Sequence, residues 1–291
     1  MRVEEGFVST PPGKVWYRRV GGECAQLASL LLLHGGPGAS HDYLENLEAL
    51  ASPEREVIFY DQLGCGKSDQ PDDPALWTVE LFVRELARMR ESLGLSRVHI
   101  LGQSWGGMLA IEYMLTRPPG VVSLILSNAT SSMPLWVAEA NRLRAALPAD
   151  VNATLLEHER AGTTSSAEYA KAMMTFYDRH VCRVTPYPDF VERSFAQIGV
   201  VYKTMSGPSE FHVTGVIRDW DRTSRLGEIR TPTLVISGEF DESTPTINRV
   251  LHEGIAGSQW VMLKNCSHLS HVEDPQGYML TVRDFLARVE A

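Results

Sequence analysis

A serine stands between two glycines in Gly102-Gln103-Ser104-Trp105-Gly106, where an apolar run gives way to a helical pattern. The pattern G-x-S-x-G in this context is typical of a nucleophilic serine on a sharp turn between a strand and a helix. The flanking glycines are needed because side chains there would collide with the neighbouring strand and helix. The alternative is a serine that caps the helix. The motif arises by chance in about one chain of this length in ten, so partners for the serine must be found.

A serine hydroxyl becomes a nucleophile when a base takes its proton and a third group orients that base. The expected order along such a chain is Ser, then Asp or Glu, then His. Asp241 ends the apolar run TLVISGEFD, and His268 follows the run QWVMLKN. Each residue taken alone has a plainer interpretation, as a turn aspartate or a loop histidine. Together with Ser104 they predict a catalytic triad.

His271 competes with His268 for the role of the base, because it lies three residues further along the same loop. His268 is favoured because it lies nearer the end of the preceding apolar run. His271 leads directly into Asp274 and Pro275, which are typical of the cap and the first turn of a helix.

Acyl transfer also needs N–H groups that stabilise the oxyanion of the intermediate. The stretch His34-Gly35-Gly36-Pro37-Gly38 follows an apolar run, and its glycines allow the backbone to approach a reacting carbonyl. Pro37 has no N–H, so Gly36 is the predicted donor, with the N–H of Trp105 as the second. The alternative is a simple glycine turn.

The stretch DQLGCGKSD, from Asp61 to Asp69, superficially resembles a phosphate-binding loop. Such a loop requires a glycine five places before Gly66, and Asp61 occupies that place. The stretch is therefore interpreted as a structural turn beside the active site, without nucleotide binding.

Six short apolar runs, which end in glycine or polar turn residues, must position these side chains. They read as buried strands because both of their faces are apolar. Helical patterns lie between them, of which Thr78 to Leu93 is the clearest, and another follows Ser104 and stops at Arg117 to Gly120. This alternation predicts a mostly parallel sheet flanked by helices, with the site at the carboxyl ends of the strands. The runs cover residues 27–36, 56–64, 97–104, 121–129, 231–241 and 259–265.

The alternation stops between residues 132 and 225, which read as helices and loops without a convincing strand. We expect a helical cap there, inserted into a discontinuous core of residues 1–131 and 226–291.

Composition excludes several classes of partner. The 291 residues contain 44% hydrophobic and 22% charged residues and have a formal net charge of −9, which argues against nucleic acid and an anionic membrane as partners. No signal peptide and no membrane-spanning run is evident, so a cytoplasmic protein is expected. The four cysteines are scattered, which predicts reduced thiols and no metal site: Cys24, Cys65, Cys182 and Cys266.

The motifs HGGPG, DQLGCGKSD, GQSWGG, GEFDE and CSH, in this order, resemble those of the proline iminopeptidase group of the α/β-hydrolases. The resemblance covers nearly the whole chain, including HVCR (180–183) and GPSEF (207–211). It implies the α/β-hydrolase fold and, without metal or other cofactor, release of an N-terminal residue from short peptides or hydrolysis of amino-acid amides. It also implies that Glu210 and Glu242 hold the free amine of the substrate.

Two other functions stay open. An esterase, a lactonase or a related hydrolase would use the same triad on neutral esters, without needing a free amine. A ligand-binding protein on the same fold would not use the triad at all. Neither the preferred N-terminal residue nor the oligomeric state follows from the sequence.

Overall fold

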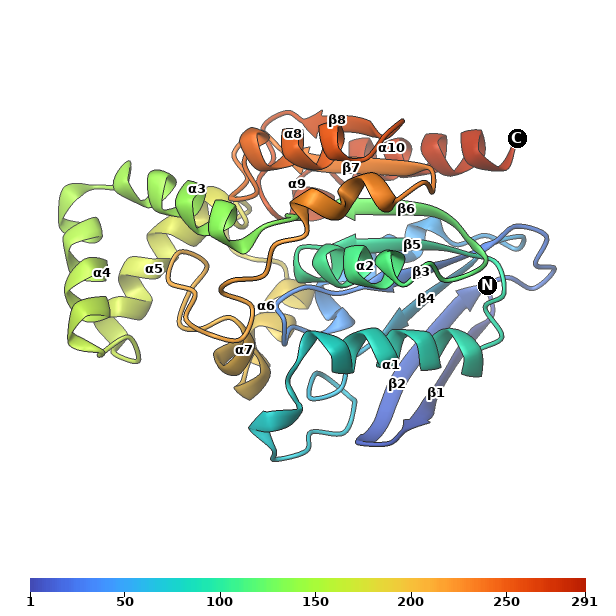
Figure 1. The fold of residues 1–291 in the computed structure, drawn as a ribbon, viewed down its shortest axis with the longest axis horizontal. Helices are drawn as coiled ribbons and strands as arrows, with labels where there is room; N and C mark the ends of the chain where they lie inside the picture. Colours follow the sequence, from blue (N-terminus) through green and yellow to red (C-terminus); the bar gives the residue numbers. More distant parts are fainter.

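The computed structural model describes residues 1–291, which form an eight-stranded sheet in the order β1-β2-β4-β3-β5-β6-β7-β8 (Figure 1). The strands from β4 to β8 in this order run parallel to one another, whereas β1 and β2 form an antiparallel hairpin that pairs antiparallel with β4. The strands are β1 (Val3–Thr10), β2 (Gly13–Gly21), β3 (Ser29–Leu33), β4 (Glu56–Tyr60), β5 (Val98–Gln103), β6 (Val121–Ser127), β7 (Thr233–Gly238) and β8 (Gln259–Leu263).

All six predicted strands are present, and the predicted mostly parallel sheet flanked by helices is confirmed. The hairpin of β1 and β2 was not predicted. Most of β1 is partly or fully exposed, and only Val8 in it is buried. A search for runs that are apolar on both faces misses such an edge strand, because one of its faces is exposed to solvent.

Alternate side chains along the central strands pack into two separate apolar layers, one on each face of the sheet. In β3, Leu31 and Leu33 pack into the layer that includes helices α1, α2 and α8, whereas Leu30 and Leu32 face the layer of η1 and α10. This two-sided burial explains why the central strands read as continuous apolar runs. The flanking helices are η1 (His41–Leu50), η2 (Pro74–Leu76), α1 (Val79–Ser92), α2 (Trp105–Leu115), η3 (Thr223–Glu228), α8 (Pro245–Gly254), α9 (Ser270–Glu273) and α10 (Pro275–Glu290).

Helix boundaries follow the capping residues that the sequence offers. The Thr78 side chain accepts a hydrogen bond from the Leu81 N–H and caps α1, and Asp274 accepts one from the Gly277 N–H and caps α10. Helix α2 ends just before the predicted breaker at Arg117 to Gly120. No helix of the protein combines the length and the apolar composition that crossing a bilayer requires.

Five α-helices lie between β6 and η3 and contribute no strand to the sheet, and Figure 1 shows α3, α4 and α5 beyond one end of the strands. We call residues 132–225 the helical insertion; this division of the chain stays a prediction. The Arg144 guanidinium bonds both carboxylate oxygens of Glu159 and thereby joins α3 to α4. The helices are α3 (Met133–Ala145), α4 (Ala149–Ala161), α5 (Ala167–His180), α6 (Asp189–Ala196) and α7 (Val200–Met205).

A charged network attaches the last helix, α10, near the amino ends of the central strands β3 and β5, at the end of the sheet away from the predicted site. The Glu290 carboxylate accepts hydrogen bonds from Arg55 Nη2 at 2.5 Å and from the buried His99 Nε2 at 3.1 Å, and the Ala28 N–H lies 3.2 Å from it. Partial burial opposes the ionisation of Glu290, but the bonds from Arg55 and His99 outweigh it and hold its pKa below the ordinary value.

We expect Glu290→Gln to lower the free energy of unfolding at pH 7 by about 1–3 kcal/mol, because it removes a charge-assisted hydrogen bond from a mostly buried site. Since the folded-state pKa of Glu290 is depressed, its contribution is present above the ordinary pKa of about 4.3 and is lost as the pH falls through the folded-state value. Urea unfolding should therefore show a difference between the two proteins that shrinks below about pH 4. The exposed Glu253→Gln serves as the control, and an equal effect of both variants would contradict the role of this network.

Candidate active site

Ser104 occupies a strained turn between β5 and α2, with φ 56° and ψ −123°. A side chain at Gly102 would place its Cβ 2.2 Å from the Gly106 carbonyl oxygen, and a side chain at Gly106 would place its Cβ 2.1 Å from the Leu33 carbonyl oxygen. Both flanking glycines are therefore required by contact with backbone, for the reason expected from the sequence. The turn directs Ser104 to the carboxyl end of the sheet, where it lines a cavity.

Asp241 follows β7 and is buried beneath this cavity. Its carboxylate accepts hydrogen bonds from His268 Nδ1 at 2.8 Å, from Asn128 Nδ2 at 2.6 Å and from the Ser243 N–H at 2.8 Å. Asn128 follows β6 with a φ of 52°. The sequence analysis missed Asn128, although an asparagine at a strand end is a residue that tolerates this conformation.

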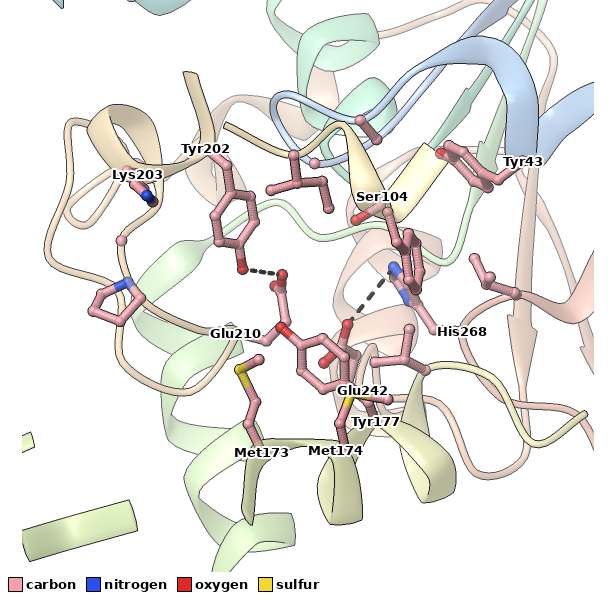
Figure 2. Close-up of a pocket in the computed structure, with 18 of the residues that line it drawn as sticks. Tyr43, Ser104, Met173, Met174, Tyr177, Tyr202, Lys203, Glu210, Glu242 and His268 are labelled. Carbon is pink, nitrogen blue, oxygen red and sulfur yellow. Dashed lines mark hydrogen bonds and ion pairs between the residues drawn. The ribbon is translucent and has the colours of Figure 1, made fainter. Parts of the chain in front are cut away.

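The structure brings His268 and Ser104 to the same cavity. Because Nδ1 of His268 is bound to Asp241, the other ring nitrogen, Nε2, is left for proton transfer. No hydrogen bond joins Ser104 Oγ to His268, and Nε2 lies 3.8 Å from an oxygen of Glu242 (Figure 2). Nucleophile and base often reach bonding distance only when substrate binds. The Trp136 ring packs edge to face on the imidazole, with centroids 5.6 Å apart.

His271 is placed differently from its competitor. It is fully buried, its Nε2 donates to the Tyr43 carbonyl oxygen at 2.9 Å, and burial lowers its pKa to about 4. Its ring lies between those of Tyr43 and Tyr278. His271 thus supports the loop, and His268 is the histidine that contacts Asp241.

The two predicted oxyanion donors flank Ser104. The Gly36 N–H has no acceptor within the protein, and Gly36 has a φ of 112°. A Cβ there would lie 2.4 Å from the Gly38 nitrogen, so only glycine fits. Gly36, Ser104 and Trp105 border a small recess of about 10 Å³ next to the main cavity. The arrangement fits a donor pair around a reacting carbonyl.

Glu210 of the helical insertion and Glu242 of the core reach the same cavity from different parts of the chain (Figure 2). Glu242 is 1% exposed, and its Oε2 has no hydrogen-bond partner. Glu210 Oε1 accepts a hydrogen bond from the Tyr202 hydroxyl at 2.5 Å. Burial raises the pKa of both carboxyl groups, and repulsion from Glu210 and Asp241 raises that of Glu242 further. In the absence of a cation, burial therefore favours the uncharged form of both carboxyl groups, and no lysine or arginine of the protein pairs with either.

The cavity has a volume of about 650 Å³, and the insertion supplies most of its apolar wall. Tyr202, which holds Glu210, was not found by sequence analysis, because a tyrosine within a helical segment carries no signal of its role. Among the apolar wall residues, the insertion supplies Met173, Met174, Tyr177, Val181, Phe195 and Ile198.

Outside the cavity, His41, Asp42 and Glu45 lie close enough together to share a metal ion. All three already have protein partners: Asp61 bonds His41 Nδ1 at 2.8 Å, and the Arg193 guanidinium contacts Asp42 at 3.3 Å and Glu45 at 2.7 Å. A cation in that place would compete with a guanidinium, so this cluster is better explained by its ion pairs.

Comparisons with known proteins identify the family of the chain. The family model described as alpha/beta hydrolase fold matches residues 28–275. The chain is 41% identical to a proline iminopeptidase of Lactobacillus crispatus over 290 residues, which cover 98% of this chain and 99% of the relative. The solved structure of VinJ is 40% identical with a TM-score of 0.94, covering 98% of this chain and 99% of VinJ.

The crystal structure of the proline iminopeptidase of Mycobacterium smegmatis is 41% identical to the chain, with a TM-score of 0.90 and coverage of 98% of both proteins. The fold, the family model and the relatives all indicate the same family. These relatives match the chain over nearly their full length. The chain belongs to the α/β-hydrolase family and, within it, to the group of the proline iminopeptidases.

Proposed function

We propose that the protein is a serine aminopeptidase, which releases the N-terminal residue from short peptides or hydrolyses amino-acid amides through an acyl-enzyme intermediate. The observation that carries the proposal is the pair Glu210 and Glu242 beside Ser104 and His268. No lysine or arginine forms an ion pair with either carboxylate, and one oxygen of Glu242 has no partner. A bound ammonium group would supply the missing positive charge and the missing hydrogen-bond donors.

The proposed reaction begins when Ser104 Oγ attacks the carbonyl carbon of the N-terminal residue and His268 Nε2 takes the hydroxyl proton. Asp241 holds the imidazole through Nδ1 and stabilises its charged form. The N–H groups of Gly36 and Trp105 stabilise the oxyanion. His268 then gives its proton to the leaving nitrogen as the C–N bond breaks. Water, deprotonated by His268, then attacks the acyl carbon. The bond from this carbon to Ser104 Oγ breaks, His268 returns the proton to Oγ, and the free amino acid leaves.

A small recess beside Ser104 has a volume of about 10 Å³, close to that of one water-sized group, so it extends the main cavity only slightly. It is walled in part by Met133, Trp136 and Ile217, and Glu210 lies at its border. An amine bound at Glu210, with its carbonyl at Ser104, would place the first residue against these apolar side chains. The main cavity would hold most of the substrate, including the leaving group. The proposal includes a cytoplasmic location, because four unpaired cysteines are typical of a protein in a reducing compartment.

Ser104→Ala should abolish turnover of an aminoacyl arylamide, with a loss of about four orders of magnitude or more in kcat, because no other group supplies the nucleophile. Binding of the substrate should persist, since the carboxylates and the oxyanion donors remain, and calorimetric titration measures it. Turnover above roughly a hundredth of wild type would contradict the role of Ser104. A fluorophosphonate probe that fails to label folded wild-type protein would favour a ligand-binding protein instead.

Glu210→Gln and Glu242→Gln should each lower kcat/KM for substrates with a free amine by about ten- to a hundredfold, because a desolvated, charge-assisted contact is lost. Small neutral esters should be cleaved almost as before. The exposed Glu192→Gln, also in the insertion, is the control and should change neither rate.

N-acetylation of the substrate should reproduce the loss in the wild-type enzyme, because it removes the positive charge and adds bulk. Equal cleavage of acetylated and free-amine substrates would replace the aminopeptidase proposal with the esterase alternative.

The pH profile of kcat/KM for a free-amine substrate should be bell-shaped. Burial raises the pKa of Glu210 and Glu242, so affinity for the ammonium group should increase as the pH rises through these raised values. Activity should fall again as the substrate amine loses its proton, at a pKa of about 7.7–8.0. A neutral ester should lack this alkaline fall, and a plateau to pH 10 with the amine substrate would exclude recognition of its charged form.

A further inference from the structure

Gln62, in the turn that follows β4, connects the two backbone segments that carry the proposed oxyanion donors. Its side-chain Nε2 donates to the His34 carbonyl oxygen at 2.9 Å, and its Oε1 accepts from Trp105 Nε1 at 2.8 Å. The indole can only donate and the carbonyl can only accept, so the partners determine the orientation of the amide. Gln62 is completely buried and does not line the cavity. It therefore acts on the site through other residues.

A second bond pairs the backbone of Gln62 with the His34 side chain. The Gln62 N–H donates to His34 Nε2 at 2.9 Å, so Nε2 must be unprotonated and the proton must be on Nδ1. Nδ1 then donates to the Gly35 carbonyl oxygen at 3.0 Å. Burial lowers the pKa of His34, which favours this neutral form. The segment from His34 to Gly36 is thus held on both its backbone and its side chain.

Close contact on the other side leaves little freedom for the first turn of α2. Gly106 lies against the backbone of β3, and a Cβ there would also lie 2.9 Å from the His34 carbonyl oxygen. The Trp105 ring packs edge to face on Phe82, with centroids 5.9 Å apart. The turn of Gln62 is itself held from α1, because buried Glu85 accepts a hydrogen bond from the Leu63 N–H at 3.0 Å.

We propose that Gln62 is a positioning residue that sets the separation of the Gly36 and Trp105 N–H groups, and thereby the fit of the oxyanion hole to the transition state. The inference rests on the proposed function, because it concerns the oxyanion of acyl transfer. Donors that act on developing charge must be preorganised, and small displacements of such groups reduce the rate strongly. Gln62 contacts both segments with one amide. The Tyr43 hydroxyl makes a separate link, because it accepts a hydrogen bond from the Gly35 N–H and donates one to the Gln103 side chain, but it does not contact Trp105.

The first test is Gln62→Met, which keeps the length of the side chain and removes both amide bonds. We expect kcat for an aminoacyl arylamide to fall by about ten- to a hundredfold, with KM changed less than about threefold, because the amine subsite is untouched. The rate at which a small neutral fluorophosphonate labels Ser104 should fall by a similar factor, since that reaction also develops charge in the oxyanion hole.

Arg90→Met is the matched control, because Arg90 is a buried hydrogen-bonding residue near the amino ends of β5 and β6, away from the site. It bonds the Tyr113 hydroxyl and the carbonyl oxygens of Leu95 and Pro119. This variant should lose stability but keep kcat and the labelling rate. If both variants lose kcat in proportion to their loss of stability, Gln62 is merely structural and the proposal is overturned.

Trp105→Phe supplies a second, independent variant, since it removes the indole N–H and leaves the backbone donor in place. It should reduce kcat and the labelling rate in the same way. In the double variant, the fold-reduction of kcat should be smaller than the product of the two single reductions, because both substitutions remove the same hydrogen bond between Gln62 and Trp105. Strictly multiplicative losses, or an unchanged labelling rate in Gln62→Met, would overturn the proposal. If the proposed aminopeptidase function is wrong, the wild-type protein will not turn over free-amine substrates. The rates at which the fluorophosphonate labels wild type and Gln62→Met would still test the role of Gln62.

Discussion

The close approach of the first turn of α2 to the end of β3 is the constraint on which the rest of the site depends. Gly106 lies so near the Leu33 carbonyl that no side chain fits between them. This contact places Ser104 on its strained turn, and it brings the Trp105 N–H to the segment that carries Gly36. The energetic cost of such a backbone conformation, of order 1–3 kcal/mol, is offset by the packing of the central sheet on both sides.

Electrostatics distinguishes this site from a general hydrolase site on the same fold. Three carboxylates converge near His268: Asp241 is satisfied by four hydrogen-bond donors, whereas Glu210 has the Tyr202 hydroxyl and Glu242 has an oxygen without a partner. A protein retains buried charge of this kind at a cost in stability, which is typical of functional sites. In the proposed function, the ammonium group of the substrate would offset that cost on binding, which would couple recognition to catalysis in one cavity.

The sequence predicted the sheet, the turn at Ser104 and the positions of Asp241 and His268, because each follows from a local pattern at a strand end. It missed the hairpin of β1 and β2, whose exposed face hides the apolar signal. It also missed Asn128, Tyr202 and the role of Gln62. Such polar residues have no periodicity. Asp241 lies 113 residues from Asn128, and Trp105 and His34 lie 43 and 28 residues from Gln62, whereas Tyr202 and Glu210 are eight residues apart.

By itself, the sequence determined the order of the elements and the glycines that the turns need, since these depend on neighbours along the chain. The choice between His268 and His271 was argued from proximity to a strand end, but only the structure shows which imidazole contacts Asp241 and which is buried against Tyr43. Likewise, the resemblance implied that Glu210 and Glu242 act together. Only the structure shows that the helical insertion, beyond the end of the strands, brings Glu210 to the same cavity as Glu242. Contacts between segments so distant in sequence depend on packing geometry, which no local pattern encodes.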